Sequence, residues 1–231
     1  MICAEDLIAK FQYALDNHWG YIWGAAGSVW TQAKQNATSN DMAKKYGQQW
    51  VGHTVADCSG LFTWAFKQLG GTMYHGSDTM FRKYTTASGA LKAGKRTDGQ
   101  ELLPGTAVFV YNEGKKNYSH VGLYIGNGYV IEAASTQKGV IRSKVSDAKW
   151  EYWGELRGLS FKREPVPKGY AEVTGTRVAL RSGPTTAASV LTRVDTGKRV
   201  KKETPPPSDW EYVSYDGKKG YMMKKFLRED W

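Results

Sequence analysis

Residues 57–69 read DCSGLFTWAFKQL. From Leu61 onward the apolar side chains recur at helical spacing, and a Gly-Gly pair directly after residue 69 ends the pattern. Asp57 is of a residue type that caps helix N-termini. The stretch therefore predicts a largely buried helix that begins directly after Asp57, with Cys58 in its first turn.

The segments around this helix predict helices first and a sheet later. Residues 4–17 carry apolar side chains at helical spacing, and residues 29–49 are polar with a loose helical period. Asn127-Gly128 predicts a type I′ hairpin turn, because both central residues of that turn need a positive φ. Helices followed by an antiparallel sheet predict an α+β domain. The apolar period becomes two after residue 104, in runs at 107–111, 120–125, 129–133 and 153–161.

The last third of the chain has a different pattern. Residues 162–169, KREPVPKG, predict a linker because they hold two prolines, four charged side chains and almost no apolar ones. Short β-rich runs follow, separated by turn signals such as the prolines at 205–207. A segment of this size and pattern predicts a small all-β barrel. We expect domains over residues 1–161 and 170–231.

The composition excludes several classes of protein. The chain has 231 residues, 41% hydrophobic and 13% aromatic, which is too rich in apolar side chains for a disordered protein. No stretch approaches the roughly 20 apolar residues of a membrane span. The net charge of +10 is spread over the whole chain without a dense basic patch. This positive charge is compatible with a negatively charged cell-wall or membrane surface as well as with a nucleic acid. Because the charge forms no dense patch, we expect no nucleic-acid partner.

The two cysteines, Cys3 and Cys58, lack metal-binding spacing. The first turn of a helix stabilises a thiolate through unpaired N–H groups and the helix dipole, so Cys58 is a candidate nucleophile. His120, at the start of a predicted strand, is a candidate base that shares a strand face with Gly122. The alternatives are a cysteine kept for packing and a histidine that is simply hydrogen-bonded at a sheet edge.

A third polar group is expected to orient the histidine. Glu132 lies among apolar residues, and a buried carboxylate needs a partner. A regular hairpin around Asn127-Gly128 pairs position 123 with about 132, and so does not place Glu132 opposite His120. A strand twist, a bulge or an intervening strand could still bring the two together.

These motifs resemble a known family. Residues 57–60 and 119–128, with the upstream Tyr21-Ile22-Trp23-Gly24, are similar to the NlpC-type cell-wall cysteine peptidases, a papain-like family that hydrolyses peptidoglycan stem peptides. The resemblance implies a papain-like fold and a cut after D-γ-glutamate, without a metal ion or cofactor. It also implies roles for individual residues: Cys58 as nucleophile, His120 as general base and acid, and Tyr21, Asp57 and Ser59 as contacts for the amino end of the stem peptide.

Two features depart from the family pattern. The third polar residue is usually His, with Asn or Gln as variants, whereas here it is Glu132; a carboxylate would hold the imidazolium more strongly. The distance between Tyr21 and Cys58 is also long, so residues 29–53 look like an insertion, for which we expect a packing role rather than a cover over the groove.

The C-terminal part is similar to bacterial SH3-type wall-binding modules at residues 176–184 and 217–222. The expected protein is thus a monomeric endopeptidase that acts at the cell wall, binding stem peptides and, through the barrel, a wall polymer. The alternatives are an amidase or other peptide-bond cutter with the same residues, and a non-catalytic wall-binding protein. The N-terminus lacks the pattern of a secretory leader, which would fit an endolysin released by a phage, a tail-associated hydrolase, or a chain whose leader was removed.

Overall fold

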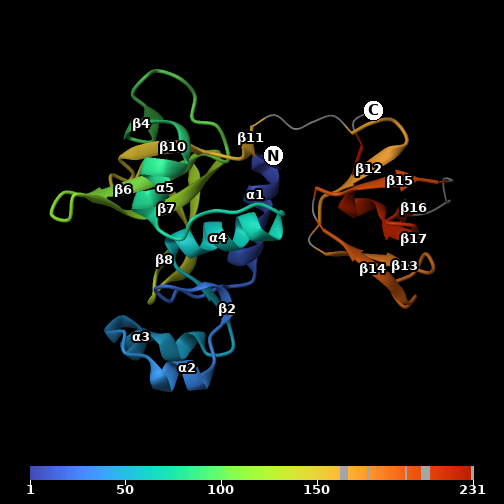
Figure 1. Ribbon diagram of the computed structural model, residues 1–231, viewed down its shortest axis with the longest axis horizontal. Helices are drawn as coiled ribbons and strands as arrows, with labels where there is room; N and C mark the ends of the chain where they lie inside the picture. The colour runs from blue at the N-terminus through green and yellow to red at the C-terminus, as the bar shows by residue number, and fades with distance from the viewer. Residues whose placement is uncertain (162–165, 176, 196, 204–208, 230–231) are drawn as a thin grey trace. The chain divides into compact units, whose positions relative to one another are not determined.

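The computed structural model describes residues 1–161, 166–175, 177–195, 197–203 and 209–229 (Figure 1). The chain divides into two compact units, Met1–Phe161 and Lys162–Trp231. Residues 162–165 of the expected linker and the expected turn at 205–207 lie outside the described residues. Among the helices of the described ranges, none is both long and apolar enough to cross a membrane.

A seven-stranded antiparallel sheet forms the centre of the first unit, in the order β5-β4-β10-β6-β7-β8-β9. The turn between β7 and β8 has φ of 52° at Asn127 and 81° at Gly128, as a type I′ turn requires. Strands β4, β5 and β9 were not predicted, because their polar, half-exposed sequences show no clear alternation. The strands are β4 (Thr85–Lys92), β5 (Lys95–Arg96), β6 (Ala107–Asn112), β7 (Asn117–Gly126), β8 (Tyr129–Ser135), β9 (Gly139–Lys144) and β10 (Tyr152–Leu156).

Three helices pack on one face of this sheet. They are α1 (Ala4–Asp16), α4 (Cys58–Gln68) and α5 (Ser77–Tyr84), and all three contact β7. Phe11 of α1 meets Phe62 of α4 edge to face with ring centroids 4.7 Å apart, inside a core that the sheet completes. Helices on one face of an antiparallel sheet confirm the expected α+β fold class. Helix α5 was missed, because it is only 8 residues long and holds few apolar side chains.

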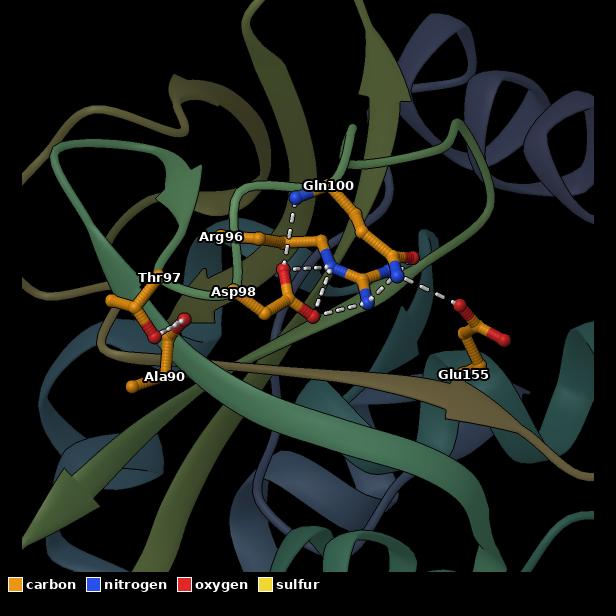
Figure 2. Close-up of polar contacts among 6 residues, drawn as sticks. All are labelled: Ala90, Arg96, Thr97, Asp98, Gln100 and Glu155. Carbon is orange, nitrogen blue, oxygen red and sulfur yellow. Dashed lines mark hydrogen bonds and ion pairs between the residues drawn. The ribbon is translucent and has the colours of Figure 1, made fainter.

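The other face of the sheet is covered by the side chains of Trp150 and Trp153 and by the segment after β4. Arg96 fastens that segment. Its side chain is buried, and its guanidinium lies 3.5 Å from the centre of the Trp153 ring. It donates to Asp98 at 2.6 Å and to Glu155 of β10 at 3.3 Å (Figure 2). This bonding of a buried charge holds the β4–β5 hairpin against β10.

The segment between α1 and α4 forms a small layer of its own. Trp30 is buried there in a cluster with Ile22, Ala43 and Val55. Trp50 donates its indole N–H to the carbonyl of Thr136 at 2.6 Å. Both tryptophans therefore pack within the fold. The elements of this layer are β2 (Ala26–Val29), α2 (Gln32–Ala37), α3 (Asp41–Tyr46), the 3₁₀ turn η1 (Gly47–Trp50) and β3 (Thr54–Ala56).

The second unit is a seven-stranded antiparallel sheet in the order β14-β13-β17-β16-β15-β12-β18, with its own apolar core. Its elements are β12 (Tyr170–Val173), β13 (Val178–Arg181), β14 (Val190–Val194), β15 (Arg199–Lys202), β16 (Trp210–Tyr215), β17 (Lys218–Met223), the 3₁₀ turn η2 (Lys224–Phe226) and β18 (Leu227–Arg228). Separately, β1 (Ile2–Cys3) pairs in parallel with β11 (Leu159–Ser160) and ties the two ends of the first unit together.

Candidate active site

Cys58 is the first residue of helix α4, and Asp57 is its N-cap. One Asp57 carboxylate oxygen, Oδ1, accepts from the Gly60 N–H at 2.7 Å and from the Ser59 hydroxyl at 3.1 Å. This is the side-chain cap that the sequence predicted. It fixes the first turn of α4 and holds the Cys58 thiol at the positive end of the helix dipole.

The second oxygen of Asp57, Oδ2, binds two groups from elsewhere in the chain. It accepts from the Gly24 N–H at 2.8 Å, and it lies 2.8 Å from the His75 Nε2 atom. The Asp57 N–H donates to the carbonyl of Ala25 at 2.8 Å. A Cβ at position 60 would overlap that same carbonyl oxygen, so only glycine lets the Gly24-Ala25 segment pack this closely on the helix.

His120 of β7 lies between two partners. Its Nε2 is 2.7 Å from the Oε2 atom of Glu132, and its ring is close enough to Cys58 for the thiol to affect its pKa. Because Nε2 is taken by Glu132, Nδ1 is the ring nitrogen left for other partners. Burial opposes a charge on His120, but the hydrogen bonds to Cys58 and Glu132 and the negative charges of both raise its pKa to about 9.

The contact between His120 and Glu132 depends on a bulge. The regular register pairs Leu123 with about residue 132, which would turn Glu132 away from the face that carries His120. In the structure the register shifts by one residue near the turn, and Leu123 pairs with Ile131. The simple register was therefore wrong by one residue. The bulge is one of the features that the sequence left open, and it places Glu132 on the same face as His120.

Glu132 is fully buried and carries three hydrogen-bond partners. Besides His120, Lys149 donates to both of its carboxylate oxygens, at 2.5 and 2.7 Å, and the Ser143 hydroxyl donates to Oε1 at 2.5 Å. Burial raises the pKa of Glu132, but the hydrogen bonds from His120, Lys149 and Ser143 outweigh it and lower the pKa to about 2. Glu132 is thus a permanent anion beneath the imidazole.

Trp150 supports the histidine from the side. Its ring stacks on that of His120, with centroids 5.6 Å apart and an interplanar angle of 21°. The neighbouring Lys149 ammonium lies 4.5 Å from the centre of the same indole. A Cβ on Gly122 would come within 2.8 Å of this indole. The space that Gly122 leaves beside His120 is therefore filled by Trp150, and this packing limits the rotation of the imidazole.

A pocket of about 360 Å³ opens at the thiol. Burial raises the pKa of Tyr21 above its ordinary value of 10.0, and the charges of Cys58 and Asp57 add to the effect, so the phenol keeps its proton near neutral pH. Trp23, 73% exposed, stands at the rim. The pocket is lined by Tyr21, Trp23, Gly24, Asp57, Cys58, Ser59, His75, Gly76, Ser77 and Ser119.

Comparison with known protein families identifies the first unit. Residues 30–156 match the model of the NlpC/P60 family. The chain belongs to the NlpC/P60 family. Residues 176–228 match the model of a bacterial SH3 domain, so the chain joins an NlpC/P60 domain to an SH3-like barrel.

Known relatives match parts of the chain. It is 28% identical over 145 residues to the murein DD-endopeptidase MepH of Escherichia coli (strain K12), a match that covers 57% of this chain and 47% of MepH. It is 41% identical over 66 residues to the probable endopeptidase NlpC of the same strain, covering 28% of this chain and 42% of NlpC. The chain therefore spans less than half the length of these two relatives. The solved structure of the peptidoglycan hydrolase RipB from Mycobacterium tuberculosis is 22% identical, with a TM-score of 0.42 over 67% of this chain and 64% of RipB.

The first unit brings together all six residues singled out from the sequence. His120 is hydrogen-bonded to Glu132 and interacts with Cys58, while Tyr21, Asp57 and Ser59 share the pocket at the thiol. Sequence reasoning missed three further residues: His75, Ser143 and Lys149. No local pattern marks them, because each meets its carboxylate partner from another element of the fold.

Proposed function

We propose that the NlpC/P60 domain is a peptidoglycan hydrolase, a cysteine endopeptidase that cuts stem peptides between D-γ-glutamate and the diamino acid. One observation carries the proposal: His120 interacts with Cys58, which lies at a helix N-terminus, and is hydrogen-bonded to the buried anion of Glu132. This line of thiol, imidazole and carboxylate is the arrangement that activates a nucleophilic cysteine.

The proposed reaction is acyl transfer. The Cys58 thiolate attacks the amide carbonyl, and the backbone N–H groups of the first turn of α4 stabilise the oxyanion. His120 gives its proton to the leaving amine as the C–N bond breaks, which leaves a thioester on Sγ. Water, deprotonated by His120, then attacks the thioester, and the C–S bond breaks to release the acid and restore the Cys58 thiolate beside the protonated His120. Glu132 keeps the imidazole oriented and stabilises its charged form.

The pocket supports a bound amino group. Asp57 places a buried negative charge beside the thiol, which favours a cationic group of the substrate. Its two oxygens already bind Gly24, Ser59, Gly60 and His75. We therefore assign direct contact with the amino end of the stem peptide to the Tyr21 and Ser59 hydroxyls, with Asp57 supplying charge and holding Ser59 in place.

Purified sacculi incubated with the full chain test the proposal. The Cys58→Ala variant should release no peptides, while the matched variant Cys3→Ala should release them at the wild-type rate. Continued release by Cys58→Ala would remove the assigned nucleophile. In the Cys3→Ala variant, Cys58 is the one cysteine left to react with a thiol alkylator. Rapid labelling at neutral pH is expected if its thiolate is stabilised. Slow labelling of Cys58, together with no peptide release by the Cys3→Ala variant or the wild type, would favour the non-catalytic wall-binding protein.

Mass spectrometry of the released fragments decides the bond. A new terminus at D-γ-glutamate is expected. The relative MepH is named a DD-endopeptidase, and a cut at a D-D bond would keep the chemistry but replace the proposed bond. Release of intact stem peptides from the glycan would instead indicate an amidase. We further propose that the SH3-like barrel binds a wall polymer, that the protein works as a monomer and that it acts at the cell wall.

A further inference from the structure

A pocket on the outer face of the SH3-like barrel carries three arginines. It has a volume of about 240 Å³, and its lining includes Arg177, Arg181 and Arg193 around an apolar floor with Trp210, Met223 and Phe226. Guanidinium groups bind planar oxyanions through paired N–H donors, so three arginines among the residues that line one hollow are a chemically specific feature.

Strand pairing explains why the arginines meet. In β13 the buried residues Val178 and Leu180 point into the barrel core, so Ala179 and Arg181 face outward. Ala179 pairs directly with Arg193 of β14, which puts Arg193 diagonally across from Arg181 on the same face. The small Ala179 side chain between them leaves the hollow open.

The positive charge of this pocket is not neutralised by the described residues. Arg181 donates to the carbonyl of Ala188 at 2.8 Å and Arg193 to that of Arg177 at 3.2 Å, and within the described ranges no carboxylate forms an ion pair with any of the three arginines. The ion pairs that the described residues of the barrel do form involve other basic side chains. They are Glu172–Arg228, Glu203–Lys219, Glu211–Lys202, Glu211–Lys224 and Glu229–Lys202.

We infer that this pocket binds the free carboxylate end of a wall peptide. The carboxylate would lie among the arginine forks, and a small apolar side chain next to it would pack on Trp210 and Met223. The apolar floor favours a peptide end over a polyol phosphate, whose backbone offers nothing apolar to bury. The choice of a wall peptide rests on the proposed function, whereas the recognition of a carboxylate rests on the pocket alone.

The test uses the full chain with Cys58→Ala, so that binding is measured without hydrolysis. The probes are N-acetyl-D-alanyl-D-alanine and its C-terminal carboxamide, titrated while amide NMR signals of the barrel are followed. We expect the acid to bind at β13 and β14 at least about 10-fold more tightly than the carboxamide, because only the acid offers an anion to the forks. Equal binding of the two probes, or no binding of either, would overturn the inference.

Variants separate fork recognition from general charge attraction. Arg181→Gln with Arg193→Gln should weaken binding of the acid by at least 10-fold, and Arg181→Lys with Arg193→Lys, which keeps the charge, by about threefold or more. The matched control, Lys198→Gln with Lys201→Gln, removes the same charge from exposed positions and should change binding less than twofold. Thermal unfolding checks that each variant is folded. If the control loses as much as the arginine pair, general attraction explains the binding and the inference fails.

A third probe, glycerol 1-phosphate, distinguishes the source of the anion. If it binds more tightly than the acid, the pocket recognises a phosphate-bearing polymer and the peptide assignment is wrong. The outcomes are independent of catalysis: loss of hydrolysis in the proposed-function experiment leaves this titration unaffected, and a failed titration leaves the hydrolase assignment unaffected.

Discussion

Replacing Glu132 with Gln should narrow the pH range of activity from its alkaline side. Glu132 is a buried anion 2.7 Å from His120, and the thiolate–imidazolium pair persists only while the imidazole stays protonated. The raised pKa of about 9 for His120 places the alkaline limb of the wild-type profile near that pH. The amide of Gln is uncharged, so it removes stabilisation of the cation, and the pKa of His120 falls toward its ordinary value of 6.5.

The size of the effect follows from the geometry. An opposite charge in direct contact shifts a pKa by about one to three pH units. The alkaline limb should therefore move down by that amount, which corresponds to about 1.4 to 4 kcal/mol less stabilisation of the imidazolium. The fold should persist, because Gln has the shape of Glu and can still accept from His120. Lys149, whose side chain is 38% exposed, can turn to water.

The assay is kcat/KM against pH on a soluble stem-peptide substrate. Ser143→Ala is the matched control, since it removes one hydrogen bond from Glu132 but keeps the charge, and its alkaline limb should stay close to that of the wild type. If the limb of Glu132→Gln also stays near pH 9, the carboxylate does not stabilise the imidazolium and the assigned role is wrong.

Three further predictions concern the groups around the site. Lys149→Met should lower kcat by up to about 100-fold with little change in KM, because Glu132 loses two hydrogen bonds and then orients the His120 imidazole less well. An unchanged kcat would contradict this prediction. Gly60→Ala should destabilise the first unit by about 1–3 kcal/mol in thermal unfolding, because the added Cβ would overlap the carbonyl of Ala25. The control Gly114→Ala should have little effect, because its added Cβ meets only one atom, at 3.5 Å. Equal melting temperatures of the two variants would refute the packing argument. The lowered pKa of about 2 for Glu132 means that its stabilising contribution is complete above its ordinary pKa of 4.5 and is lost as the pH falls toward 2, so the difference in unfolding free energy between wild type and Glu132→Gln should shrink over that range rather than stay constant.

Local patterns predicted the elements that carry the thiol and the imidazole. Apolar spacing and the cap at Asp57 placed Cys58 at a helix start, and strand alternation placed His120 beside Gly122 on one face. These features depend on neighbours within a few residues, which is the range over which propensity and periodicity act. Strand β9 and helix α5 were missed because both are short and hold few apolar side chains from which a pattern could be read.

The sequence alone determined the α+β class, the barrel pattern and the thiol at a helix N-terminus. Tertiary structure decided which carboxylate binds which histidine: Glu132 binds His120, and Asp57 binds His75. A single bulge turned Glu132 toward His120, and the folded chain brought Lys149 to Glu132 across 17 residues and His75 to Asp57 across 18. Such contacts form because buried charges must find partners wherever the packed elements supply them, and a one-residue slip in register reverses every side chain of a strand. No periodicity in the chain encodes either choice.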